Sequence, residues 1–91
     1  MKGITARRYY VSGRVQGVGF RYFTVRAAEA LGVTGWTRNL ADGRVEVHAN
    51  GTAKQLDDLE SRLRAGPPAA DVRGFDVGDS GVIEATGFQI R

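Results

Sequence analysis

Residues 13–21, which read GRVQGVGFR, have the types and spacing best suited to chemistry in this chain. Glycines allow backbone N–H groups to turn inward and approach a ligand closely. A helix beginning after them would add unpaired N–H groups with a partial positive charge. Arg21 in its first turn opposes that charge at a cost of about 0.3–1 kcal/mol, which a bound anion would offset. The pattern predicts an anion-binding site; the alternative is a surface arginine with a water or carboxylate partner.

The composition excludes several other kinds of active site. The chain contains no cysteine, which rules out disulfides, thiolate nucleophiles and zinc–thiolate sites. Its single histidine, His48, cannot form a cluster of imidazole metal ligands, and it alternates with polar residues as an exposed strand residue would. No apolar run approaches the roughly 18 residues of a membrane span, and no secretory signal begins the sequence. We therefore expect one small cytoplasmic domain over residues 1–91 that does not bind membranes.

Charge is distributed unevenly along the chain, whose net charge is +3. Residues 1–44 contain eight Lys and Arg against two Asp and Glu, whereas residues 45–91 contain five against eight. The glycine-rich segment lies in the positive half, which favours an anionic ligand there. This excess of positive charge is smaller than that of a dedicated nucleic-acid binder, which carries a broad basic face. No nucleic-acid partner is therefore expected.

Hydrophobic periodicity predicts a strand, a helix and two further strands in the first part of the chain. The strand over residues 8–14 leads into the glycine-rich loop, and the helix begins at Phe20 and ends before Gly32. Strands follow over 34–39 and 44–50, joined by an Asp-Gly turn at 42–43. The apolar side of the helix comprises Phe20, Phe23, Ala27, Ala30 and Leu31. In the strand over 44–50, the core-facing residues are Val45, Val47 and Ala49.

The second half of the chain predicts one helix and two short strands. Thr52 and Gln55 form a capping box, and the Gly-Pro-Pro step at 66–68 ends the helix. A strand over 71–77, a turn over 78–81 and a final extended segment follow. The apolar side of this helix comprises Ala53, Leu56, Leu59 and Leu63.

This order of elements predicts an α+β fold of the ferredoxin-like βαββαβ type, with two helices on one face of an antiparallel sheet and a short extra C-terminal strand. In that topology the strands over 8–14 and 34–39 run in the same direction, with the strand over 44–50 between them. Asn39 then lies about 10 Å from the glycine-rich loop, a gap that the loop and Arg21 can span. We expect Arg21, the loop N–H groups and Asn39 to surround one small cavity.

The motifs GRVQGVGFR and GWTRNLADGRVEV, at their spacing here, resemble those of the acylphosphatase family over nearly the whole chain. The resemblance implies a cofactor-independent and metal-free hydrolase acting on a small acyl phosphate, with inorganic phosphate or sulfate as competing anion. We expect this hydrolase to be a monomer. It implies that Arg21 binds the phosphoryl group and Asn39 holds the attacking water. Thr37 stands where an aliphatic residue is more usual, but no catalytic role is carried over to it. The backbone N–H groups implied in phosphate binding belong to Gln16, Gly17, Val18, Gly19 and Phe20.

These residue types suit phosphoryl transfer, whose loose transition state needs charge stabilisation and alignment. Arginine donates two parallel hydrogen bonds to phosphate oxygens, and fixed backbone N–H groups add preorganised dipoles. Asn39 can orient water but cannot take its proton. A carboxylate leaving group, whose acid has a pKa of about 4, departs without a general acid. We therefore hypothesise that the water proton passes to a phosphate oxygen of the substrate.

Two alternatives are an RNA-binding module and an accessory domain of the same fold that binds an anion without turnover. The segment GVGFRYF superficially resembles an aromatic RNA-binding motif. That motif lies on a central strand, where its rings stack on bases, whereas this segment is predicted to run from a loop into a helix. The Walker A pattern is also absent, because Phe20 and Arg21 follow Gly19 in place of lysine and a hydroxyl residue.

Overall fold

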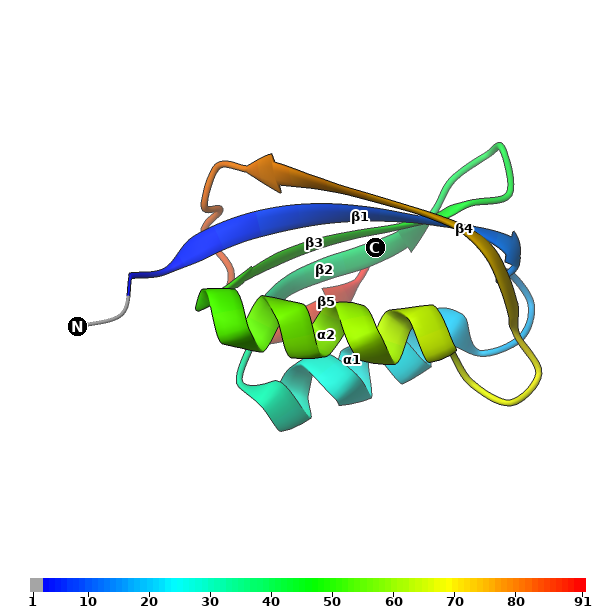
Figure 1. The fold of residues 1–91 in the computed structure, drawn as a ribbon, viewed down its shortest axis with the longest axis horizontal. Coiled ribbons are helices and arrows are strands. Elements are labelled where there is room, and N and C mark those ends of the chain that lie inside the picture. The colour runs from blue at the N-terminus through cyan, green and yellow to red at the C-terminus, as the bar shows by residue number, and fades with distance from the viewer. Residues whose placement is uncertain (1–2) are drawn as a thin grey trace.

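The computed structural model describes residues 3–91, which form two helices packed on one face of a five-stranded sheet (Figure 1). The predicted βαββαβ order with an added C-terminal strand is confirmed. The first two residues of the domain predicted over residues 1–91 lie outside the described residues. In chain order the elements are β1 (Thr5–Arg14), α1 (Phe20–Leu31), β2 (Thr34–Asn39), β3 (Val45–Gly51), α2 (Ala53–Ala65), β4 (Asp71–Ser80) and β5 (Phe88–Ile90).

The order of strands in the sheet determines which chain segments meet at one end. The strands are arranged β4-β1-β3-β2-β5. Both β1 and β2 pair antiparallel with β3, so they run in the same direction and end on the same side. β5 pairs parallel with β2, which makes the sheet mixed, whereas the prediction was an antiparallel sheet. As predicted, the ends of β1 and β2 at Arg14 and Asn39 lie on one side of the molecule.

The hydrophobic core lies between the helices and the sheet. Three leucines of α2 and the aromatic rings of Tyr9 and Phe20 are fully or almost fully buried there, and the Tyr9 hydroxyl donates a hydrogen bond to the Leu56 carbonyl at 2.8 Å. The core-facing residues predicted for β3 are confirmed: Val45, Val47 and Ala49 are all buried.

The buried side of each helix differs from the predicted one at individual positions. In α1, Ala30 is exposed, whereas Thr24 and Ala28 are buried. Thr24 can be buried because its hydroxyl donates a hydrogen bond to the Phe20 carbonyl at 2.9 Å. In α2, Ala53 is exposed, since it lies at the first position of the helix. Neither helix of the described chain is long and apolar enough to cross a membrane.

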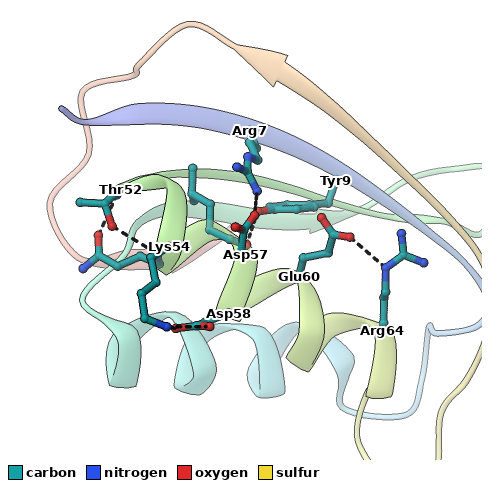
Figure 2. A network of polar contacts seen from close by, with 10 residues as sticks. Arg7, Tyr9, Thr52, Lys54, Asp57, Asp58, Glu60 and Arg64 are labelled. Atoms are coloured by element: carbon teal, nitrogen blue, oxygen red, sulfur yellow. Dashed lines mark hydrogen bonds and ion pairs between the residues drawn. The ribbon is translucent and has the colours of Figure 1, made fainter. Parts of the chain in front are cut away.

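The start of α2 carries the predicted capping box, which Figure 2 shows at Thr52. The Thr52 N–H donates to Gln55 Oε1 at 2.8 Å, and the Gln55 N–H donates to Thr52 Oγ1 at 3.2 Å. Gln55 also donates to the Leu31 carbonyl at 2.9 Å, which links the start of α2 to the end of α1. Further along α2, Asp57 accepts a hydrogen bond from Arg7 of β1 (Figure 2).

The predicted turn over residues 78–81 is wrong, because β4 continues to Ser80. Gly78, Asp79 and Ser80 pair with the first part of β1, which itself begins at Thr5, three residues before the predicted strand. Hydrogen bonds to β1 thus keep these three residues in a strand, although glycine, aspartate and serine are more typical of turns.

His48 is also placed differently from the prediction, since only 2% of it is exposed. Its ring packs edge-on against Trp36, and its two nitrogens lie 3.3 Å from Arg8 Nη2 and 3.2 Å from the Gly81 carbonyl oxygen. Asn50, on the same side of β3, donates to the Ile83 carbonyl at 2.7 Å. Alternation correctly put His48 on the side of the sheet away from the helices, but arginine side chains and the segment after β4 cover that side.

Candidate active site

The loop between β1 and α1 has a backbone conformation that leaves its N–H groups available. Gly17 and Gly19 have φ angles of 73° and 79°, a left-handed conformation that glycine adopts at little cost. A Cβ atom at either position would meet no atom within 4 Å. Glycine is therefore favoured there by the left-handed backbone conformation and not by lack of space. Within residues 3–91, no backbone carbonyl accepts a hydrogen bond from the N–H of Gln16, Gly17, Val18 or Gly19. Four consecutive donors are therefore free to bind an anion.

The first turn of α1 adds further donors. Gly19 is the N-cap of this helix, no side chain caps it, and its first turn contains no acidic residue. The N-terminus of α2 differs, because Thr52 caps it. The positive end of α1 thus remains available for a negatively charged ligand. Arg21 lies in this first turn, and no carboxylate within residues 3–91 forms an ion pair with it.

A cavity of about 160 Å³, which we call the cradle, lies between this loop and the end of β2. It brings together five of the residues predicted for the site, while Gln16 and Val18 do not line it. The two predicted side chains, those of Arg21 and Asn39, thus lie around one cavity, as the topology led us to expect. The lining comprises Val15, Gly17, Gly19, Phe20, Arg21, Tyr22, Asn39 and Ile90.

Asn39 contributes an oxygen atom that has no partner. This residue ends β2, and its Oδ1 is buried without a hydrogen-bond donor among the described residues. A buried acceptor left unsatisfied costs about 1–3 kcal/mol. Because Asn39 lines the cradle, a water molecule held there could donate the missing hydrogen bond.

The Gln16 side chain connects the two halves of the site. Its Nε2 donates to the Leu40 carbonyl at 2.8 Å and to the Arg44 carbonyl at 3.0 Å. These carbonyls belong to the turn between β2 and β3, which the Leu40 N–H closes by donating to the same Arg44 carbonyl at 2.8 Å. Only the backbone N–H of Gln16 was predicted to take part in the site, and nothing in the local sequence pattern indicates a side-chain partner 24 or 28 residues away.

Three residues that line the cradle, Val15, Tyr22 and Ile90, were not predicted for the site. Ile90 reaches the cradle because β5 pairs parallel with β2, with Ile90 opposite Thr37. Tyr22 follows Arg21 in the first turn of α1, and 62% of it is exposed. The only signals in the sequence were the apolar type of Ile90 and the proximity of Tyr22 to the glycine-rich loop.

Among residues 3–91, no carboxylate lines the cradle. Asp42 pairs with Arg44 in the exposed turn, and the Arg44 N–H is the main cause that lowers the pKa of this carboxyl group. Glu46 is buried on the side of the sheet away from the helices. Burial raises its pKa, but hydrogen bonds from Arg38 and Tyr10 and nearby arginine charge outweigh that effect, so the pKa lies below its usual value. Within residues 3–91, no group of three or more acidic or histidine side chains could hold a metal ion.

Comparison with known proteins identifies the family of this chain. A sequence model described as Acylphosphatase matches residues 7–90. A protein of Solibacter usitatus named acylphosphatase is 51% identical over 86 residues, which cover 94% of this chain and 90% of that protein. Among solved structures, an acylphosphatase from Coxiella burnetii has a TM-score of 0.92 at 38% identity, covering 97% of this chain and 93% of the other. One from Bacillus subtilis has a TM-score of 0.91 at 37% identity, covering 98% and 99%. The chain therefore belongs to the acylphosphatase family.

Proposed function

We propose that this protein hydrolyses the carboxyl–phosphate anhydride of acyl phosphates, releasing a carboxylate and inorganic phosphate. In this proposal the guanidinium of Arg21 and the N–H groups of residues 16–20 bind the phosphoryl group, and Asn39 orients the attacking water. Membership of the acylphosphatase family supports the reaction. The cradle supports the roles of Gly17, Gly19, Phe20, Arg21 and Asn39, which line it. The N–H groups of Gln16 and Val18 are included because no backbone carbonyl within residues 3–91 accepts a hydrogen bond from them.

The observation that carries the proposal is the buried, unpartnered Oδ1 of Asn39 in the lining of the cavity that Arg21 also lines. Attack by water on a phosphoryl group requires an acceptor that holds the water on one side and donors that bind the anion on the other. Within residues 3–91, no carboxylate forms an ion pair with Arg21, and no donor forms a hydrogen bond to Asn39 Oδ1. Both groups are therefore available to a substrate and a water molecule.

The reaction is then a displacement at phosphorus. The oxygen of the water held by Asn39 forms a bond to phosphorus, and the bond from phosphorus to the acyl oxygen breaks, its electron pair leaving with the carboxylate. Negative charge on the phosphoryl oxygens is stabilised by Arg21 and the loop N–H groups, which need not rearrange as the charge develops. The water proton passes to a phosphoryl oxygen, so the products are the carboxylate and protonated phosphate.

The absence of a carboxylate from the cradle lining supports this route for the proton. Glu46 and Asp42 are the acidic residues nearest to Asn39 in the sequence, and both are engaged in ion pairs outside the cradle. A carboxylate leaving group needs no general acid, because its conjugate acid has a pKa of about 4.

No structural feature of residues 3–91 favours the RNA-binding alternative. Phe20 is only 1% exposed, and its ring packs against that of Phe23 with the centroids 6.0 Å apart. Rings that stack on nucleobases must be accessible on a sheet surface. Membership of the acylphosphatase family does not favour the other alternative, an accessory domain that binds an anion without turnover.

The test is hydrolysis of benzoyl phosphate by the purified protein, followed as a loss of ultraviolet absorbance. We expect turnover without added metal, with inorganic phosphate inhibiting competitively. Phosphate binding without turnover would instead identify an accessory anion-binding domain. The monomeric state and the cytoplasmic location expected from the sequence stay predictions.

A further inference from the structure

A second cavity, of about 440 Å³, adjoins the cradle on the side of the helices, and we call it the helix-side groove. Gly19 and Tyr22 line both cavities, so the two adjoin at the start of α1. The rest of the groove is formed along α1 and by residues at and just after the end of α2, where the two helices lie side by side (Figure 1). Its further lining comprises Phe23, Arg26, Ala27, Ala30, Arg62 and Pro67.

The groove lies where the chemistry requires space for the acyl group. In a displacement at phosphorus the attacking water and the leaving oxygen are roughly in line, on opposite sides of the phosphoryl group. Asn39, which holds the water in the proposed reaction, lines the cradle but not the groove. The groove adjoins the cradle at Gly19 and Tyr22, away from Asn39, and is the space into which an acyl group opposite the water would extend.

The lining of the groove combines apolar surface with two unpaired cations. Phe23, Ala27 and Pro67 provide apolar contacts for a hydrocarbon chain or ring. Neither Arg26 nor Arg62 forms an ion pair with a carboxylate within residues 3–91. Arg64, on the same helix as Arg62, pairs with Glu60 in contrast (Figure 2).

We propose that the helix-side groove binds the acyl group of the substrate and that Arg26 and Arg62 favour acyl groups carrying a second anion, a carboxylate or a phosphate, remote from the reacting anhydride. This inference rests on the proposed acyl phosphate hydrolysis. Both guanidinium groups belong to exposed residues, so each contributes a modest, salt-sensitive preference of roughly threefold.

The test compares two substrates that differ at one remote position. 4-Carboxybenzoyl phosphate and 4-methylbenzoyl phosphate have similar size and the same rigid ring, and only the first carries a second anion. We expect kcat/KM to favour the carboxylated substrate about tenfold at low ionic strength, as the product of two roughly threefold contributions. Arg26→Gln and Arg62→Gln should each lower this ratio roughly threefold, and the double variant should bring it close to one. Added salt should reduce the ratio in the wild type.

Arg64→Gln is the matched control, because it removes one charge from α2 at a residue that does not line the groove. It should leave the substrate ratio unchanged. A wild-type ratio near one, or a ratio that the double variant does not alter, would overturn the inference about the groove. Turnover of 4-methylbenzoyl phosphate in the same experiments shows that the proposed function stands in that case. If the wild type hydrolyses neither substrate, the proposed function itself fails, and the assignment of the groove fails with it.

Discussion

Gln16 Nε2 lies 2.8 Å from the carbonyl oxygen of Leu40, the residue that follows Asn39. This hydrogen bond joins the loop between β1 and α1, which lines one side of the cradle, to the turn between β2 and β3. That turn follows Asn39, which lines the other side. The proposed donors for the phosphoryl group and the proposed acceptor for water come from segments about 20 residues apart in the sequence. Their relative position therefore depends on contacts between β1, β2 and β3 and on this side-chain bridge.

Gln16→Ala should reduce turnover while the chain remains folded. The substitution keeps the backbone N–H but removes two hydrogen bonds to carbonyls, at a cost of about 1–2 kcal/mol in the free energy of unfolding. Misplacement of the loop relative to Asn39 should lower kcat about tenfold. Gln89→Ala, at an exposed glutamine of β5, is the control and should change neither quantity. Loss of stability with an unchanged kcat would show that the bridge has a structural role only.

Much of this arrangement was predictable from the sequence, because it follows from local patterns and topology. The capping box of α2, the glycine that ends α1 and the alternation in β3 identified those elements. The βαββαβ order then placed Asn39 near the glycine-rich loop.

The features that the sequence did not predict depend on contacts between distant segments. Gly78 and Asp79 have types that favour turns, yet they extend β4 because they pair with β1. His48 is buried because Trp36, Arg8 and the segment after β4 cover it. The reach of Gln16 to the turn after Asn39 depends on the same long-range assembly.

His48 should make the stability of the protein depend on pH. Burial is the main cause that lowers its pKa below the ordinary value of 6.5, and the charge of Arg8 acts in the same direction. The neutral ring is thus favoured in the folded state, so the unfolded chain binds the proton first as the pH falls. This contribution to stability is fully present above 6.5 and is lost as the pH falls from there through the lower pKa of the folded state.

The measurement is chemical denaturation of the wild type and of His48→Gln between pH 5 and 8. The difference between their free energies of unfolding should shrink as the pH falls. A difference independent of pH would mean that the ring is not held neutral by its surroundings.

Glu46→Gln and Asp42→Asn should leave the pH profile of kcat unchanged, because neither carboxylate lines the cradle. Glu46→Gln should cost about 1–2 kcal/mol of stability, since it weakens the contacts of a buried carboxylate with partly exposed arginines. The profile is measured with benzoyl phosphate at a temperature where both variants are folded. A profile altered by either substitution would contradict transfer of the proton to the substrate.

Arg21→Gln should abolish inhibition by inorganic phosphate and reduce turnover about 10³-fold or more, because in the proposed reaction the guanidinium stabilises charge on the transferring phosphoryl group. Arg14→Gln, at the exposed end of β1, makes the same change in charge near the loop and should leave turnover close to that of the wild type. Normal phosphate inhibition in Arg21→Gln would mean that another group binds the anion.

The most direct test of the account is the pair of values, kcat for benzoyl phosphate and the inhibition constant for inorganic phosphate, measured in Asn39→Ala. In the proposed reaction Asn39 orients water while Arg21 and the loop hold the phosphoryl group, so kcat should fall about 100-fold and the inhibition constant should stay near the wild-type value. A near-normal kcat in Asn39→Ala, or a loss of phosphate inhibition equal to the loss of turnover, would contradict the division of roles within the cradle.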